Sequence, residues 1–159
     1  MSELKNIKQV IFPQTFALLP AAMDSLRSRA MLLAIGLQES RFVYRVQEGG
    51  PAHGFWQFES GGGVKGVLDH PSTRDLILPI CSVRGVIPTV RDCYAAIVDD
   101  DVLACAFARL LLWTLPGVLP NRDERQKGWD QYIEAWRPGA PHRHTWDAFF
   151  DQAWVEVLS

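Results

Sequence analysis

The sequence lacks a long apolar run. A helix that crosses a membrane needs roughly 20 consecutive apolar residues, whereas the most apolar segment, LACAFARLLLWTL, is interrupted by Arg109 and followed by Pro116. The first residues, MSELKNIKQVIF, lack the basic start, apolar core and small-residue cleavage site of a secretory signal. We therefore expect no membrane insertion and no conventional signal peptide, so that a target outside the cytoplasm would have to be reached by another route.

Runs of lysine or arginine are also absent. The chain carries 16 basic and 18 acidic residues, which gives a net charge of −2. Proteins that bind nucleic acids rely on clustered positive charge to neutralise phosphates. The charge distribution therefore argues against a nucleic-acid partner.

Cysteine is scarce. Cys81, Cys93 and Cys105 are odd in number, spaced too widely for a metal knuckle, and surrounded by apolar residues. We expect buried free thiols in a reducing compartment. The stretch GGGVKG contains the G-x-G-x-x-G spacing of dinucleotide-binding loops, but no strand pattern precedes it, so a tight loop is the better interpretation. We expect no metal and no organic cofactor.

The composition is that of a soluble globular protein. Apolar residues make up 48% and charged residues 21% of 159 residues. A chain of this length can bury a sufficient core without disulfides or metals. In the absence of repeats and low-complexity linkers, we expect a single domain over residues 1–159.

Helical periodicity dominates the chain. Leu26, Ala30, Leu33 and Leu37 recur at steps of three and four residues and predict a helix over residues 24–39, with Asp24 or Ser25 as its cap. A glycine-rich insertion follows, with the pattern of a short hairpin or an irregular loop. These features predict a mainly α fold with a glycine-rich loop or minor β element. Further helices are expected from Ser72 to Leu78, from Pro88 to about Ile97, from the triplet Asp99–Asp101 to Trp113, from Arg122 to Trp136, and from a cap at Thr145 onward.

Glu39 is the candidate for acid catalysis. It stands at the end of the first predicted helix, where backbone carbonyls disfavour a second negative charge. Nearby apolar side chains, for which Phe42, Phe55 and Trp56 are candidates, would further favour the protonated form. A carboxyl that stays protonated near neutral pH can donate a proton to the leaving oxygen of a glycosidic bond.

Two motifs resemble a known family. Gln38-Glu39-Ser40 with Phe42, followed by the segment GFWQF at residues 54–58, is similar to the leading motifs of soluble lytic transglycosylases and goose-type lysozymes. The resemblance covers about residues 33–67, and small bacteriophage-type members are the most similar. It implies a lysozyme-like fold in which Glu39 is the general acid, and also the general base if the product is an anhydro-sugar.

The resemblance also implies roles for neighbouring residues. Ser40 would orient or hydrogen-bond the Glu39 carboxyl, and Gln57 would lie on the floor of the sugar cleft. We further assign Trp56 as a platform for a sugar ring, because tryptophan faces suit the apolar C–H faces of sugars. Phe58 completes the second motif and is grouped with the substrate-binding residues. His53 lies just before this motif and is either a cleft residue or a turn residue.

The match is incomplete in a later motif. The family has an A-Y-N-A-G type segment, whereas this chain has LLLWTLPG, with Trp113 and Thr114 in place of tyrosine and asparagine. A second carboxylate is left open: Glu48, Glu59 and Asp69 are available, and Glu59 either shares a side with Gln57 or caps a turn in solvent. A transglycosylase needs no second carboxylate, because a hydroxyl of the sugar itself attacks.

The sequence therefore predicts an enzyme that cleaves the β-1,4 bond between N-acetylmuramic acid and N-acetylglucosamine in peptidoglycan glycan strands. Such a protein would be a phage lysin released by host lysis, or a virion or secretion-machine component that opens the wall locally. Two alternatives remain: a non-catalytic wall-binding or structural adaptor protein on the same fold, and a chitin-active hydrolase. The oligomeric state is open.

Overall fold

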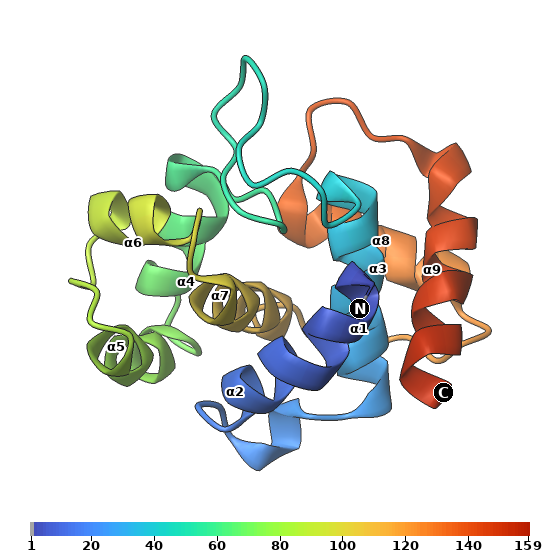
Figure 1. The fold of residues 1–159 in the computed structure, drawn as a ribbon, viewed down its shortest axis with the longest axis horizontal. Coiled ribbons are helices and arrows are strands. Elements are labelled where there is room, and N and C mark those ends of the chain that lie inside the picture. Colours follow the sequence, from blue (N-terminus) through green and yellow to red (C-terminus); the bar gives the residue numbers. More distant parts are fainter. Residues whose placement is uncertain (1) are drawn as a thin grey trace.

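The computed structural model describes residues 2–159 and shows a mainly helical chain (Figure 1). The predicted mainly α class is confirmed. No extended strand occurs within residues 2–159, where only isolated antiparallel bridges join His53 to Val46 and to Phe58. The elements are α1 (Glu3–Asn6), the π-helical η1 (Ile7–Ile11), α2 (Phe12–Phe16), the 3-10 turn η2 (Ala21–Met23), α3 (Leu26–Ser40), the π-helical η3 (Ser60–Val64), α4 (Lys65–Asp69), α5 (Arg74–Val83), α6 (Val90–Ala96), α7 (Asp101–Trp113), α8 (Arg125–Trp136) and α9 (Arg143–Leu158).

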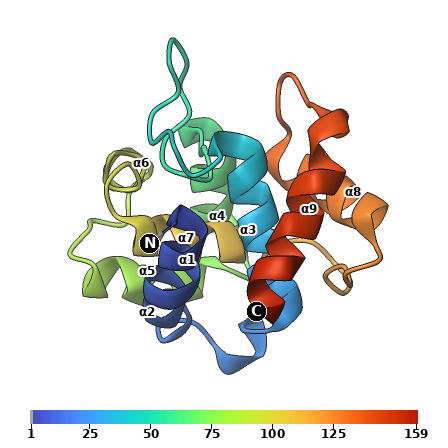
Figure 2. The ribbon, with the colours of Figure 1, turned by 45° about the vertical axis from the view of Figure 1, so that its right-hand side comes forward.

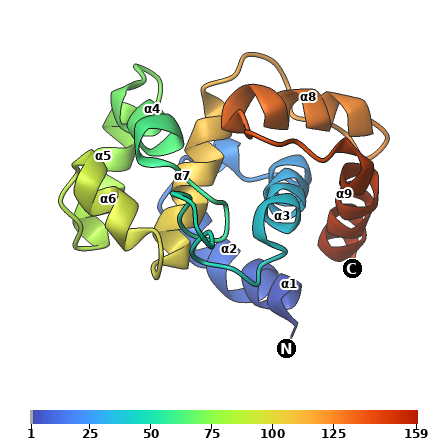
Figure 3. The same ribbon diagram turned by 90° about the horizontal axis from the view of Figure 1, so that it is seen from above.

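Helix α7 forms the centre of the molecule. Every residue from 102 to 112 is buried, as the nearly uniform apolar sequence predicts. The Asp100 side chain accepts a hydrogen bond from the backbone N–H of Leu103 at 3.0 Å, so the acidic triplet supplies the predicted cap. Figure 3 shows α7 between α4, α5 and α6 on one side and α3, α8 and α9 on the other.

Helix α3 connects this centre to the C-terminal helix. Ser25 caps it, and the side chains of Ser25 and Ser28 each accept from the other's backbone N–H, at 3.0 and 2.9 Å. The helix packs along α9, as Figure 2 shows, and also against α7. It ends at Arg41, whose φ of 54° lies in the left-handed region and turns the chain away from the helix axis.

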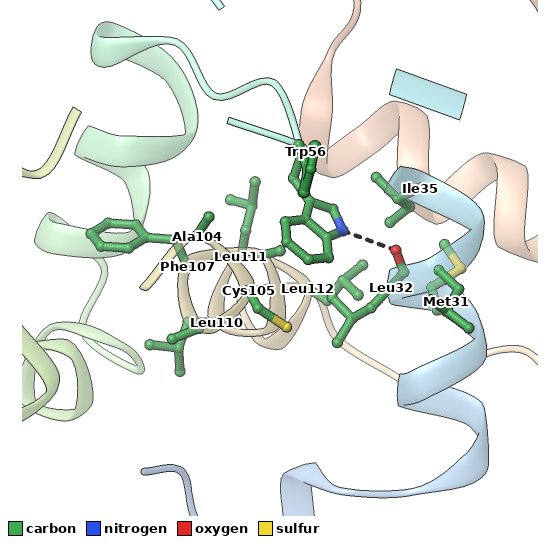
Figure 4. Close-up of a cluster of buried hydrophobic side chains, with 14 of the residues drawn as sticks. Met31, Leu32, Ile35, Trp56, Ala104, Cys105, Phe107, Leu110, Leu111 and Leu112 are labelled. Carbon is green, nitrogen blue, oxygen red and sulfur yellow. Dashed lines mark hydrogen bonds between the residues drawn. The ribbon is translucent and has the colours of Figure 1, made fainter. Parts of the chain in front are cut away.

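Trp56 lies between α3 and α7. Its side chain is fully buried, and its indole N–H donates to the carbonyl of Leu32 at 2.9 Å. Figure 4 shows the indole among side chains of both helices, with Leu111 and Leu112 on the α7 side. An aromatic ring with a satisfied N–H at this position fixes the distance between the two helices.

Several predicted helix starts shift in the structure. Helices α5 and α6 begin after Thr73 and Thr89, and α8 begins at Arg125. The predicted cap at Thr145 is wrong, because the cap of α9 is His142, three residues earlier. The Thr145 hydroxyl instead donates to the Gln38 side chain at 2.9 Å and so joins α9 to α3.

Residues 41–59 of the glycine-rich insertion form an irregular loop with isolated bridges, as predicted, but the following GGGVKG stretch is helical, contrary to the prediction of a tight loop there. Residues 60–64 form the π-helix η3, with a kink at Gly62. The expected close approach does occur: a Cβ on Gly63 would lie 2.5 Å from the Phe58 ring, so a larger residue would not fit there.

All three cysteines are buried and free, which confirms the prediction for their side chains. Cys81 on α5 and Cys93 on α6 face each other, with their sulfur atoms 3.7 Å apart. Over residues 2–159, no helix combines the length and the apolar character that a bilayer span requires.

Candidate active site

A groove lies at the C-terminal end of α3, with a cavity volume of about 430 Å³. Its two walls come from the segments 44–52 and 137–142, which belong to loops that project on the same side of the molecule in Figure 1. Its remaining lining comes from the end of α3, residues 57–59, the middle of η3, α7 and the end of α8. The lining residues are Glu39, Tyr44, Val46, Gln47, Glu48, Ala52, Gln57, Phe58, Glu59, Gly62, Gly63, Leu111, Trp136, Arg137, Pro138, Gly139, Ala140 and His142.

Glu39 lies in this groove, partly exposed, in the last turn of α3. Burial raises the pKa of its carboxyl from 4.5 to about 7, and the negative charge of Glu59 acts in the same direction. The hydroxyl of Tyr132 donates to Oε1 at 2.6 Å, which favours the ionised form and opposes this rise in pKa. Glu39 therefore exchanges its proton near neutral pH.

Tyr132 is the partner that sequence reasoning missed. It is buried on α8, and its ring stacks on Trp146 of α9, with centroids 5.3 Å apart and an interplanar angle of 7°. This stacking holds the hydroxyl in place against Glu39. Trp129, Tyr132 and Trp136 stand on one face of α8, and this aromatic face was the available signal.

The predicted hydrogen bond between Ser40 and the Glu39 carboxyl is absent, because the Ser40 hydroxyl has other partners. This hydroxyl donates to the carbonyl of Phe55 at 2.6 Å and accepts from the N–H of Phe42 at 3.1 Å, away from the Glu39 carboxyl. Ser40 therefore fastens the end of α3 to the segment that carries the second motif. Phe42 packs edge-on against Phe55 and Trp56, with ring centroids 5.5 Å away in each case.

Gln57 and Phe58 line the groove, as the sequence predicts for residues of the second motif. Gln57 has a φ of 52°, and its side-chain amide donates to the carbonyl of Gly54 at 2.9 Å. This bond closes a tight turn and leaves the amide oxygen available. Phe58 is almost fully buried and forms an apolar base beneath the groove.

Trp56 does not line the groove, and its predicted role as a sugar platform is wrong. Its ring belongs to the core between α3 and α7. Trp136 instead supplies an indole to the groove: it is partly exposed at the end of α8. The N–H of Trp136 donates to the backbone carbonyl of Trp56 at 2.8 Å. Helical spacing alone does not say which face of a helix meets a groove, so the role of Trp136 was not predicted from the sequence.

His53 is also outside the groove lining. Its ring stacks on Tyr94 with centroids 3.7 Å apart, and its Nδ1 lies 2.9 Å from the Tyr94 carbonyl. Neither predicted setting is observed: His53 pairs with Val46 and Phe58 in isolated bridges, directly before the turn at residues 54–57.

Two of the three candidate second carboxylates lie in the groove. Glu48 and Glu59 line it, whereas Asp69 pairs with Lys65 on α4. Glu59 is exposed, precedes η3 and makes no capping hydrogen bond with its side chain. Gln57 and Glu59 thus reach the same groove, and Glu59 is free to contact a ligand or water.

A second cavity adjoins the groove; it has a volume of about 820 Å³, and we call it the second lobe. The two share Glu59, Trp136 and Arg137 among other residues. Backbone of the glycine-rich segment lines the second lobe, as does Thr114 from the altered third motif. Trp113 of that motif lies elsewhere, in a separate pocket. Within residues 2–159, no cluster of three or more histidine, cysteine or acidic side chains is arranged to hold a metal ion.

Comparison with known proteins yields no relative for this chain: no family model, curated protein or solved structure matches it. The resemblance carried by the motifs at residues 38–42 and 54–58 stays a prediction. What the structure contributes is the geometry around Glu39: a carboxyl near its titration point, a hydroxyl partner, and an elongated groove.

Proposed function

We propose that this protein is a peptidoglycan-cleaving glycosidase with a lysozyme-like fold, acting on the β-1,4 bond between N-acetylmuramic acid and N-acetylglucosamine. The observation that carries the proposal is the Glu39 carboxyl, which has a pKa of about 7 and lies in a groove. A general acid works best when its pKa lies near the working pH. The substrate is proposed from the resemblance of the motifs around Glu39 and Gln57 to those of lytic transglycosylases and goose-type lysozymes.

In this mechanism Glu39 donates its proton to the leaving glycosidic oxygen. Tyr132 holds the carboxyl in one orientation and stabilises the carboxylate that forms as the proton leaves. The proton then has to return to Glu39 before the next cycle. A pKa near neutrality allows Glu39 both to donate its proton and to take one up again.

The form of the groove suits a polymer. The Glu39 groove and the second lobe share Glu59, Trp136 and Arg137 in their linings, and together they would accommodate several sugar units. Trp136 offers an apolar face for a sugar ring, while the free amide oxygen of Gln57 accepts from a hydroxyl or an acetamido N–H. The proposed setting is a phage lysin, or a virion or secretion-machine component.

Glu59 provides the test of the product. If it activates a water molecule as general base, cleavage gives a reducing sugar, and the two carboxyls must be about 6.5–9.5 Å apart in the bound state. If the sugar's own hydroxyl attacks, the product is an anhydro-sugar, lighter by one water. A Glu59→Gln variant should be impaired in the first case and little changed in the second, and mass spectrometry of the released fragments distinguishes the two.

The central experiment compares wild-type protein with Glu39→Gln in the clearing of purified cell walls. Loss of the general acid should lower the rate by about 100-fold or more. Glu3→Gln is the matched control, because it makes the same chemical change at an exposed position outside the groove. Equal clearing by Glu39→Gln and wild type would remove Glu39 from the mechanism.

The same assay separates the alternatives. Binding of walls without clearing, by both wild type and Glu39→Gln, would indicate the non-catalytic adaptor. Cleavage of chitin oligomers with no action on peptidoglycan would indicate the chitin-active hydrolase. Either result would contradict the proposed substrate.

A further inference from the structure

A separate pocket lies at the other end of α3. It has a cavity volume of about 400 Å³ and is formed by the start of α3, the end of α7 and the chain that follows α7. We name it the arginine pocket, because two arginines and no acidic residue occur among the described residues that line it. These residues are Ala22, Ser25, Arg27, Arg109, Leu112, Trp113, Leu115, Gly117, Val118 and Leu119.

Arg109 is the unusual residue of this pocket. Only 4% of it is exposed, and no carboxylate within residues 2–159 forms an ion pair with it. Its Nε donates to the carbonyl of Met23 at 2.8 Å, while its terminal nitrogens make no hydrogen bond to the described residues. Asp24 lies nearby, but Arg29 occupies both of its oxygens, at 2.7 and 2.9 Å.

Burial lowers the pKa of the Arg109 guanidinium to about 10, so it is still charged at neutral pH. A buried charge without an opposite charge is unfavourable, and such groups in proteins are normally paired. The pocket gives an anion a route to Arg109.

Further positive potential surrounds the same space. Arg27 lines the pocket; its Nη1 donates to the carbonyl of Leu119 at 3.1 Å, and it has no ion pair with the described acidic residues. The 15-residue helix α3 begins here, at Ser25, and its N-terminus adds a partial positive charge. The arginine pocket therefore receives positive charge from Arg109 on α7 and from Arg27 and the N-terminus of α3.

The rim of the pocket is apolar. Trp113 is 42% exposed there, and the Arg109 guanidinium lies over its ring, 5.6 Å from the centroid. Leu112, Leu115 and Val118 also line the pocket. The pocket thus combines positively charged side chains with apolar ones, which suits a ligand that has a charged group and an apolar or ring-shaped body.

We propose that the arginine pocket binds the phosphate group of a small molecule, with Arg109 and Arg27 contacting its oxygens and Trp113 covering its body. A phosphate fits better than a carboxylate, because its oxygens point in several directions and its charge matches two guanidinium groups. The site is separate from the Glu39 groove and does not depend on the function proposed for that groove.

Inorganic phosphate is the probe for the test, titrated by calorimetry and by thermal unfolding, with sodium chloride holding the ionic strength constant. We expect saturable binding to the wild type, and affinity at least about tenfold weaker in Arg27→Gln and in Arg109→Met. Arg91→Gln is the matched control, because Arg91 is exposed and outside the pocket. It should bind phosphate as the wild type does.

Three results would overturn the proposal. One is the absence of saturable binding to the wild type. Another is equal affinity in Arg27→Gln and Arg91→Gln, and this comparison decides the matter even if Arg109→Met fails to fold. The third is equally strong binding of acetate under the same conditions, which would show a general anion effect. Wall clearing by Arg27→Gln should equal that of the wild type, which separates this site from the groove.

Discussion

A buried ionisable group lies near each end of α3, and the two groups differ in whether burial removes their charge at neutral pH. At the C-terminal end, partial burial raises the pKa of Glu39 to about 7, so that the carboxyl keeps its proton up to about that pH. At the N-terminal end, Arg109 is buried more completely and keeps its charge, because even a lowered pKa of about 10 is far above neutrality. Glu39 is therefore suited to exchange a proton, whereas Arg109 is suited to hold an anion.

The difference also lies in the partners. Glu39 has a neutral hydrogen-bond donor, Tyr132, which leaves both protonation states accessible. Arg109 has a backbone carbonyl, which satisfies one N–H but does not balance the charge.

The largest expected effect tests Glu39 through stability. Its folded-state pKa exceeds the ordinary value of 4.5, so the folded form binds the proton more tightly. Stability from this group is complete below about pH 4.5 and is lost as pH rises through about 7. At 1.36 kcal/mol per pKa unit, the loss is about 3 kcal/mol. The difference in unfolding free energy between Glu39→Gln and wild type, measured by urea denaturation, should change by this amount between pH 4 and pH 8; parallel curves would refute the raised pKa.

A smaller effect is expected from Tyr132→Phe. Removing the hydroxyl leaves the stacking on Trp146 but takes away the bond that favours the ionised Glu39. The pKa of Glu39 should then rise, and the high-pH limb of wall clearing should move upward by up to about one pH unit. Tyr94→Phe is the control, because the Tyr94 hydroxyl donates to the carbonyl of Pro51 instead. A Tyr132→Phe profile identical to that of the control would exclude this role.

The smallest effect is expected from Arg109→Met in the absence of phosphate. Replacing a buried charge that lacks a partner by an apolar side chain of similar length is often neutral or stabilising. The unfolding free energy should stay within about 1 kcal/mol of wild type, the lost bond to Met23 being offset by the removed charge. Arg84→Met should cost more, because Asp100 would lose both of its hydrogen bonds from Arg84, at 2.9 and 3.0 Å. A loss above about 3 kcal/mol for Arg109→Met would show that Arg109 is needed to hold the fold itself.

The sequence was a good guide where the signal is local. The cap at Ser25 or Asp24, the acidic start of α7 and the apolar character of α7 depend on residues a few positions apart, and the structure agrees with each. The position of Glu39 at the end of an apolar helix was also readable in this way.

Contacts between distant segments were not readable. The hydroxyl that bonds Glu39 comes from position 132, and the indole that faces the groove comes from position 136. Trp56 was misjudged because its neighbour Gln57 does reach the groove. The positive φ of Gln57, closed by its bond to Gly54, turns the two side chains apart, and nothing in the local sequence specified that turn.

Trp56 links the interior of the molecule to its groove. Through its indole N–H it is bound to the backbone of α3, and through its own carbonyl it holds the indole of Trp136. The apolar face proposed for the sugar is thus positioned from beneath, by a residue that no ligand touches. Changes in core packing around Trp56 are transmitted to that face, which gives protein engineers a means of tuning affinity while leaving every ligand-contacting side chain intact.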